Sequence, residues 1–370
     1  MNFEFSKGLK IIFIAGGLFI VLIACSFTFF SLWAKKKVVA YLQEHTEFNV
    51  HIESVSIGLH TAEMSWLELT PKLDKEMYQQ VNGHQQDWVV SKIEHLKFYG
   101  IDWYKVMFNK KAEVDKLTLI HPHFYIYRDN TLPDSNIYKV LPATLLQSVP
   151  FPFSIKSVVF WQGKVEYEKK EENSGPHAKI VFTNLRATLS PITSDSLFAV
   201  ANPVMDVTIQ ADLLDSIKIK LESKIKLLSS NDEFTFKGSV QSFNASILNE
   251  FVTPLSNVHI KSGYINSIHF SMNADENIAI GKLDMDYHDL KVNILSEETP
   301  GKKSGLKTLL ANIFMRDEDK DVKQQEDSIG EIRFERRKDR FIFNYWWNSV
   351  RCGILTTVSK LPVDTNTLPK

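Results

Sequence analysis

The sequence predicts a mainly β protein: a long antiparallel sheet that curls, with few short helices, after one N-terminal transmembrane helix. Residues 11–33 contain no charged side chain. From about residue 50 onward, apolar and polar residues alternate in runs of five to eleven residues, which is the period of a β-strand. These runs do not alternate with helices of about 10 to 15 residues, so a parallel βαβ sheet is not expected.

Length and composition restrict the class of protein further. The chain has 370 residues, enough for one large or two medium domains, and 44% of them are hydrophobic, which is too many for a disordered chain. The 43 Lys and Arg residues nearly balance the 44 Asp and Glu residues, so the sequence does not predict a nucleic-acid-binding surface. The two cysteines are too few for a disulfide framework or a thiolate zinc cage.

The N-terminal region is predicted to be a tail of residues 1–10 followed by a transmembrane anchor at residues 11–33. A helix of these 23 residues is roughly 35 Å long, which spans the hydrocarbon core of a bilayer. The anchor is marked by the side chains Ile11, Phe19, Leu22, Phe29 and Trp33. The preferred interpretation is therefore an uncleaved signal anchor.

Three other interpretations of this segment stay open. Leu22 to Ser26 resembles a lipobox, which would make Cys25 a lipidation site, but the apolar run continues to Trp33 where a mature lipoprotein has a polar tether. A cleaved secretory signal and a buried soluble helix are the remaining alternatives. Two lysines precede the run and three follow it directly, which weakly favours a cytoplasmic body.

The expected strands follow one another along the rest of the chain. The clearest is 217–227, in which Ile217, Ile219, Leu221, Ile225 and Leu227 share one face and four lysines and Glu222 share the other. Such a strand belongs to an antiparallel sheet with one solvated face. The other expected strands are 50–59, 64–69, 89–98, 114–127, 154–160, 163–167, 178–189, 205–213, 234–240, 258–260, 265–272, 278–287 and 332–334 with 341–345.

Few helices are expected. Short helices are predicted at 34–47, 137–147 and 304–315, whereas 344–355 fits either the end of a strand or an interfacial helix. Residues 169–177 and 316–328 are charged and are predicted to be solvated loops. The Pro-containing stretch at 149–152 divides the body into an N-terminal β region, 34–150, and a C-terminal β region, 151–370.

Catalytic and metal-binding motifs are not expected. His121 and His123 would share a strand face, but no third ligand follows at a signature spacing, and Pro122 between them predicts an edge or a bulge. The sequence contains no nucleophile elbow, P-loop or HExxH zinc helix. We therefore expect no catalytic residue, metal or cofactor, and an enzyme only as a remote alternative.

The apolar strand faces carry the functional prediction. If the sheet closes on itself, these faces form an ordinary sandwich core; if it curls into a trough, they line a long apolar groove. The pattern alone favours the sandwich, which is the commoner architecture, but does not exclude the groove. If there is a groove, its lining residues are Ile217, Ile219, Leu221, Ile225, Leu227, Phe234 and Phe236.

Two patches of the chain resemble AsmA-like and TamB-like bacterial envelope proteins. The first is residues 98–129, with Val114, Leu117, Leu119, Pro122, Phe124, Ile126, Arg128 and Asp129 at the places of the family's N-terminal signature. The second comprises 236–238, 244–246, Leu255, Gly263, Phe270, 281–292 and 311–314, and is similar to the family's C-terminal region. The chain is much shorter than the long members of that family.

The resemblance implies a fold, a location and a function. It implies a single-pass protein of the bacterial inner membrane with its body in the periplasm, against the weak lysine count. It implies a curled sheet whose groove shelters phospholipid acyl chains for transport between membranes or for outer-membrane biogenesis. The implied partners are membrane lipids and an envelope protein, without nucleic acid. The alternative is a structural or partner-binding β-sandwich protein of the envelope that transfers no lipid.

Overall fold

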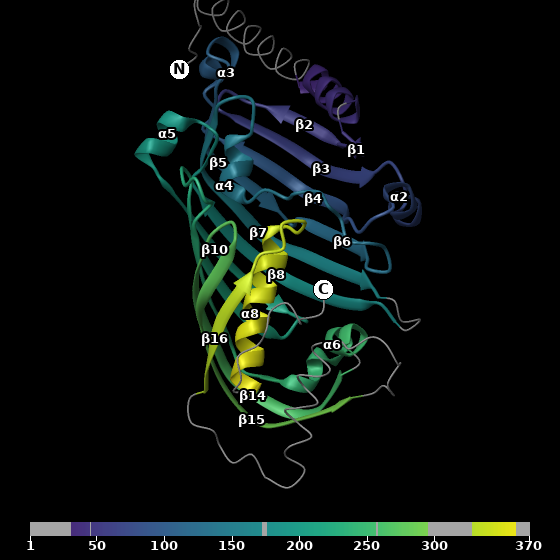
Figure 1. Cartoon of the computed structure of the whole chain (residues 1–370). Coiled ribbons are helices and arrows are strands. Elements are labelled where there is room, and N and C mark those ends of the chain that lie inside the picture. The colour runs from purple at the N-terminus through teal and green to yellow at the C-terminus, as the bar shows by residue number, and fades with distance from the viewer. Residues whose placement is uncertain (1–30, 45, 172–175, 257, 295–327, 360–370) are drawn as a thin grey trace, which may run out of the picture.

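A computed structural model describes residues 31–44, 46–171, 176–256, 258–294 and 328–359. Their strands form one mixed sheet of sixteen, which curls around helix α8, Ile342–Ser359 (Figure 1). The mainly β prediction is confirmed. The described residues contain one sheet rather than two packed sheets, so the curled form of the prediction applies and the sandwich form does not.

The first half of the sheet comes from the N-terminal part of the chain. Its strands are β1 Phe48–His51, β2 Ser54–Ile57, β3 Thr61–Pro71, β4 Trp88–Tyr99, β5 Ala112–Ile120, β6 His123–Asp129, β7 Phe153–Lys170, β8 Ala178–Ser190 and β9 Ile192–Thr193. Their order in the sheet is β1-β3-β4-β5-β7-β8, with β2 beside β3, β6 between β4 and β7, and β9 beside β7. The boundary expected at residue 150 falls directly before β7, where the sheet continues.

The second half is a meander of longer hairpins. It consists of β10 Val204–Leu213, β11 Ile217–Lys226, β12 Phe234–Val240, β13 Phe243–Asn244, β14 Val258–Ala274, β15 Ile278–Ile294 and β16 Ser328–Glu335. The order continues β8-β10-β11-β12-β14-β15-β16, with β13 beside β14. The predicted strand 234–240 matches β12, and the separate predictions 258–260 and 265–272 are one strand, β14, interrupted by bulges.

The prediction of a purely antiparallel sheet is wrong at one place. Strand β7 runs parallel to β5, pairing Ala112 with Phe153, and parallel to β6, pairing His123 with Lys164. Residues 130–152 connect β6 to β7 and carry helix α4, Pro142–Gln147. A connection of a dozen or more residues is long enough to return the chain to the same end of the sheet, which parallel pairing requires.

A line of left-handed residues crosses the first half of the sheet. Trp66, His121, Gln162 and Asn184 have φ between 48° and 51° and lie on β3, at the β5–β6 break, on β7 and on β8. The register between β7 and β8 shifts beside Gln162 and Asn184, as it does at a β-bulge. On β3, Met64 and Leu67 belong to the same core cluster although they are three positions apart, so the alternation changes sides at Trp66.

The bulge at Gln162 explains why the sequence pattern predicts two strands where the structure has one. The single strand β7 was predicted as 154–160 and 163–167, because the bulge at Gln162 breaks the period of two. Pro122 lies in the break between β5 and β6, which divides the predicted strand 114–127 into two strands.

The described helices are short apart from the first and the last. Residues 31–44 are helical, and the others are α2 Lys75–Asn82, α3 Trp103–Phe108, α4, α5 Ser196–Ala201, the 3-10 helix η1 Ala245–Leu248, α6 Asn249–Ser256 and α8. Helix α2 was not predicted, although Asp74 caps its first turn and Gly83, with φ of 65°, ends it.

The prediction of a strand at 341–345 is wrong, because α8 begins at Ile342. Helical periodicity places Tyr345, Ser349 and Cys352 on one side, and all three are at most 2% exposed. The aromatic residues fit a strand and a helix equally well in isolation, and packing against the sheet decides for the helix.

Several predictions fall on residues that the structure does not describe. They concern residues 11–30 of the anchor with Cys25, the helix 304–315, and the charged loop 316–328 except Ser328, the first residue of β16. Among the described helices, none has the length and hydropathy needed to cross a bilayer.

Candidate functional site: the apolar face of the sheet

One face of the sheet is apolar from β3 to β16 except at the buried Ser223. Two adjacent rows of paired residues cross it, and we call them together the apolar face. The first row is Met64, Leu96, Leu119, Phe160, Ala187, Ile209, Leu221, Gly238, Phe270, Leu283 and Gly330. The second is Ala62, Phe98, Leu117, Val158, Leu189, Val207, Ser223, Phe236, Met272, Gly281 and Ile332. At about 4.8 Å per strand, ten steps span roughly 50 Å.

The opposite face carries the charged residues that alternate with these rows. On β11 and its neighbours, Lys237 pairs with Glu222 at 2.9 Å and Lys224 pairs with Asp206 at 3.5 Å. Hydrogen bonds from Lys220 and Lys237 lower the pKa of Glu222 to about 2. The predicted division of 217–227 into an apolar and a charged face is therefore confirmed.

The residues predicted to line a groove lie in the core of the C-terminal half. Ile217, Ile225, Leu227, Phe234 and Phe236 are between 0% and 3% exposed. The other two, Ile219 and Leu221, are half-buried. Leu227 lies one residue beyond the end of β11.

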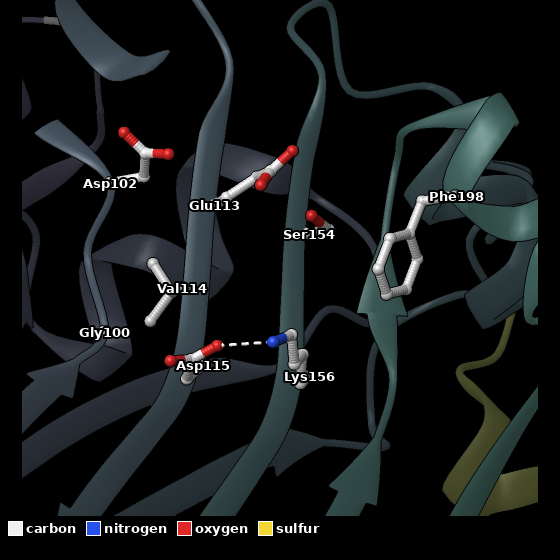
Figure 2. Close-up of a pocket in the computed structure, with 8 residues that line it drawn as sticks. All are labelled: Gly100, Asp102, Glu113, Val114, Asp115, Ser154, Lys156 and Phe198. Carbon is white, nitrogen blue, oxygen red and sulfur yellow. Dashed lines mark ion pairs between the residues drawn. The ribbon is translucent and has the colours of Figure 1, made fainter. Parts of the chain in front are cut away.

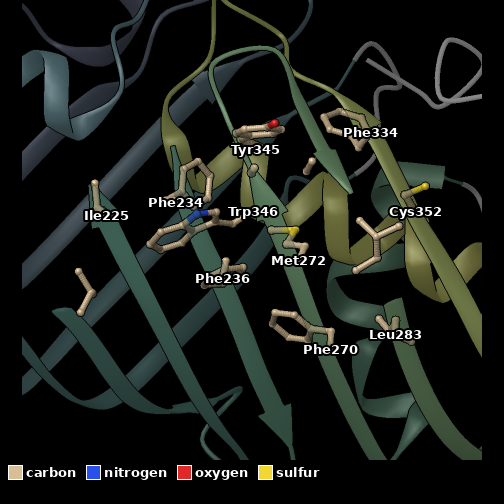
Figure 3. Packing of buried hydrophobic residues seen from close by; sticks show 14 of the residues in the cluster. Ile225, Phe234, Phe236, Phe270, Met272, Leu283, Phe334, Tyr345, Trp346 and Cys352 are labelled. Atoms are coloured by element: carbon tan, nitrogen blue, oxygen red, sulfur yellow. The ribbon is translucent and has the colours of Figure 1, made fainter. Parts of the chain in front are cut away.

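Helix α8 covers this half of the apolar face. Trp346 stacks on Phe236 with ring centroids 4.3 Å apart and an interplanar angle of 9° (Figure 3). Tyr345 meets Phe234 edge-on at 5.9 Å and packs against Phe334 at 6.2 Å. The helix therefore occupies the position that an apolar ligand of these strands would take.

Two shorter helices extend the cover. Leu141 and Ala143, at the start of α4, belong to the same core cluster as Val207 and Ile225, and Thr144 N donates to Asp232 Oδ1 at 2.8 Å. Phe251 of α6 packs against the ends of β7 and β8 in a separate cluster.

The N-terminal half of the apolar face is less covered. Its half-buried side chains are Met64, Leu96, Phe98, Leu117 and Phe160. The side chains that continue the same two rows across the C-terminal half are mostly fully buried. Helix 31–44 packs on this half through its valines and one leucine, at the edge formed by β1 to β3. Strands β4, β5 and β7 thus present apolar side chains that retain partial contact with solvent.

A polar junction holds α8 in place. Arg340, two residues before the helix, is 4% exposed and donates to Gln85 Oε1 at 2.6 Å and Asp134 Oδ1 at 3.1 Å. Lys139 N donates to Lys338 O at 2.8 Å. The segment that leads into α8 is therefore fastened to loops of the N-terminal half.

A small polar pocket of about 170 Å³ lies near α3 and α5 (Figure 2). Its lining is Gly100, Asp102, Glu113, Val114, Asp115, Ser154, Lys156 and Phe198. Lys156 pairs with Asp115 at 2.7 Å, and hydrogen bonds from Lys105 and Lys111 lower the pKa of Glu113. Glu113, held ionised by these lysines, is therefore a poor proton donor.

The two histidines considered as metal ligands have separate carboxylate partners. His121 Nδ1 contacts Glu94, and His123 Nε2 lies 2.8 Å from Glu166 Oε1. In the described part of the chain, no group of three or more His, Cys, Asp or Glu side chains could hold a metal ion.

Comparison with known proteins assigns no family to this chain. No protein-family model matches the sequence, and no curated protein matches it either.

Proposed function

We propose that this chain is an envelope protein of the AsmA-like type, anchored in the bacterial inner membrane by residues 11–33 with its body in the periplasm. Its apolar face binds phospholipid acyl chains and conducts them between membranes or serves outer-membrane biogenesis. The observation that carries the proposal is the apolar face from β3 to β16, in which Ser223 is the one polar residue of the two rows. Acyl chains require only a continuous apolar lining, and such a lining is stable in water when a ligand or partner covers it.

The bound lipid lies on the N-terminal half of the face in this proposal. Leu96, Leu117 and Phe160 are half-buried there, whereas α8 stacks over Phe236 and its neighbours in the other half. The buried residues predicted from the sequence, such as Ile225, Phe234 and Phe236, would meet lipid only if α8 moved away. The lipid site is therefore centred on β4, β5 and β7.

The test is the lipid content of the full-length chain purified in mild detergent, measured by native mass spectrometry. Leu117→Glu places a charge on the apolar face and should reduce the lipid carried. Thr118→Glu, on the same strand but the opposite face, is the matched control and should leave it unchanged. A wild-type protein without lipid, or equal lipid in both variants, would refute the proposal.

A second candidate is a structural or partner-binding protein that transfers no lipid. The observation that favours it is α8, because this helix already fills the C-terminal half of the apolar face as a peptide partner would. If a copurifying envelope protein protects Leu96 and Leu117 from labelling when they are replaced by cysteine, and no lipid is found, this second function is the correct one.

A further inference from the structure

Exposed apolar side chains gather at the corner of the molecule where α3 meets the turn between β2 and β3. Leu59 in that turn is 73% exposed, and Tyr104, Met107 and Phe108 of α3 are between 64% and 69% exposed. The two parts are joined because Trp103 Nε1 donates to Gly58 O at 3.0 Å. The corner is thus a fixed surface rather than a set of isolated side chains.

The N-terminal apolar segment ends at the same corner. Ile57, the residue before Gly58, donates its backbone N–H to Ser31 Oγ at 3.1 Å. The next two residues of the chain, Leu32 and Trp33, are 60% and 51% exposed. Figure 1 shows the start of helix 31–44 and α3 at the same end of the sheet.

Exposed lysines border the apolar corner, and the acidic side chains beside α3, Asp102 and Glu113, are paired with Lys105. Lys36 and Lys37 on helix 31–44 and Lys110 after α3 are exposed. Aromatic and apolar side chains next to lysines are the composition of surfaces that enter the interfacial layer of a bilayer with anionic lipids.

We propose that this corner docks on the bilayer that residues 11–33 enter. The docking surface consists of Leu32, Trp33, Leu59, Tyr104, Met107 and Phe108. The tip of α3 enters the headgroup layer, and the lysines face anionic lipid phosphates. Because 20 uncharged or apolar residues of the predicted anchor precede Ser31, the corner cannot lie far from the membrane. A lipid that leaves this bilayer would meet β3 and β4 first.

The inference rests on the membrane anchor of the proposed function, and its test separates the two. The full-length Cys25→Ser chain, in which Cys352 stays buried, is labelled with a fluorophore at single cysteines introduced as Met107→Cys, Phe19→Cys or Ile280→Cys. Ile280 is 50% exposed on β15 near the far edge of the sheet and is the control. Each protein is reconstituted in phosphatidylethanolamine–phosphatidylglycerol vesicles that contain a nitroxide-labelled lipid.

We expect the nitroxide lipid to quench the labels at positions 19 and 107 and to leave the label at position 280 bright. Quenching at position 19 with a bright label at position 107 would overturn the docking surface and leave the anchor intact. Bright labels at both positions would overturn the anchor as well. Phe108→Cys, tested in the same way, should give the same result as Met107→Cys, so that the conclusion does not depend on one substitution.

Discussion

The ring of Trp346 on α8 lies parallel to that of Phe236 on β12, with centroids 4.3 Å apart. This contact joins a helix near the C-terminus to a strand about a hundred residues earlier in the chain. It makes the C-terminal half of the apolar face part of the core, whereas side chains of the N-terminal half such as Leu96 and Leu117 stay half-buried.

Replacing either ring should destabilise the C-terminal half. Phe236→Ala and Trp346→Ala each remove a large buried aromatic side chain, which lowers the free energy of unfolding by about 3–5 kcal/mol. The double variant should lose less than the sum, by about 0.5–1.5 kcal/mol, because each ring is the partner of the other. Urea unfolding of the detergent-solubilised chain measures these differences. Ile280→Ala, at a half-exposed site on the charged face, is the control and should have little effect.

The approach of α8 to the sheet depends on two glycines. A Cβ on Gly330 would lie 2.2 Å from the backbone oxygen of Gly353, and one on Gly353 would lie 2.7 Å from Leu283 Cβ. We expect Gly330→Ala to lower the stability by about 1–3 kcal/mol, because the helix must move away from β16. Gly353→Ala should destabilise as well, although alanine favours a helix by about 1 kcal/mol over glycine. An increase in the unfolding midpoint of either variant would show that α8 packs elsewhere.

Arg340 should matter more than its neighbour Arg337. The Arg340 side chain is 4% exposed and bonded to Gln85 and Asp134, whereas that of Arg337 is 24% exposed. Arg340→Met should lower the free energy of unfolding by about 3 kcal/mol, since it leaves the oxygen of the buried Gln85 side chain without its donor and removes a buried guanidinium from Asp134. Arg337→Met should have an effect of about 1 kcal/mol or less. Thermal unfolding compares them, and equal effects would contradict the clamping role of Arg340.

The ion pairs of Glu166 predict a dependence on pH. Burial acts to raise its pKa, but hydrogen bonds from Lys164, Lys179 and His123 prevail and lower it from 4.5 to about 2. A depressed carboxylate pKa stabilises the fold above the unfolded value near 4.5, and this contribution is lost as the pH falls towards 2. Glu166→Gln should therefore lower stability by about 1–2 kcal/mol at pH 7. The difference from wild type should shrink between pH 5 and pH 3 in denaturant titrations, and a constant difference would contradict the ion pairing.

The left-handed conformation of Gln162 predicts that two substitutions at this position differ in stability. Gln162 has φ of 51°, and its side chain bonds to His121. Gln162→Gly and Gln162→Val both remove that bond, but valine is strained at positive φ and glycine is not. The glycine variant should be more stable than the valine variant by about 1–2 kcal/mol. Equal unfolding midpoints would mean that the bulge is absent from β7.

The sequence predicts the sheet well wherever alternation is uninterrupted. β12 is located to the residue, and the two faces of β11 are assigned correctly, because these strands pair with sequence neighbours and keep a period of two. The parallel pairing of β7 with β5 was not predicted, since it depends on a crossover that no local pattern encodes.

The sequence predicts the apolar face but not the helix that covers part of it. The apolar face exists, but the strongest alternation, at 217–227, marks the part that α8 covers. Alternation shows that a face is apolar and does not show what covers it. The half-buried residues Leu96 and Leu117 belong to strands with fewer charges on their polar side, so their signal was weaker.

The most direct test of the lipid-binding face is photo-crosslinking in cells with a benzophenone amino acid. Introduced at Leu117, it should form adducts with phospholipid, which mass spectrometry of the purified chain identifies. Introduced at Thr118, which is equally half-buried but on the opposite face, it should form none. Lipid adducts at Leu117 alone are the predicted result, and the absence of adducts at Leu117, or equal adducts at both positions, would contradict the account.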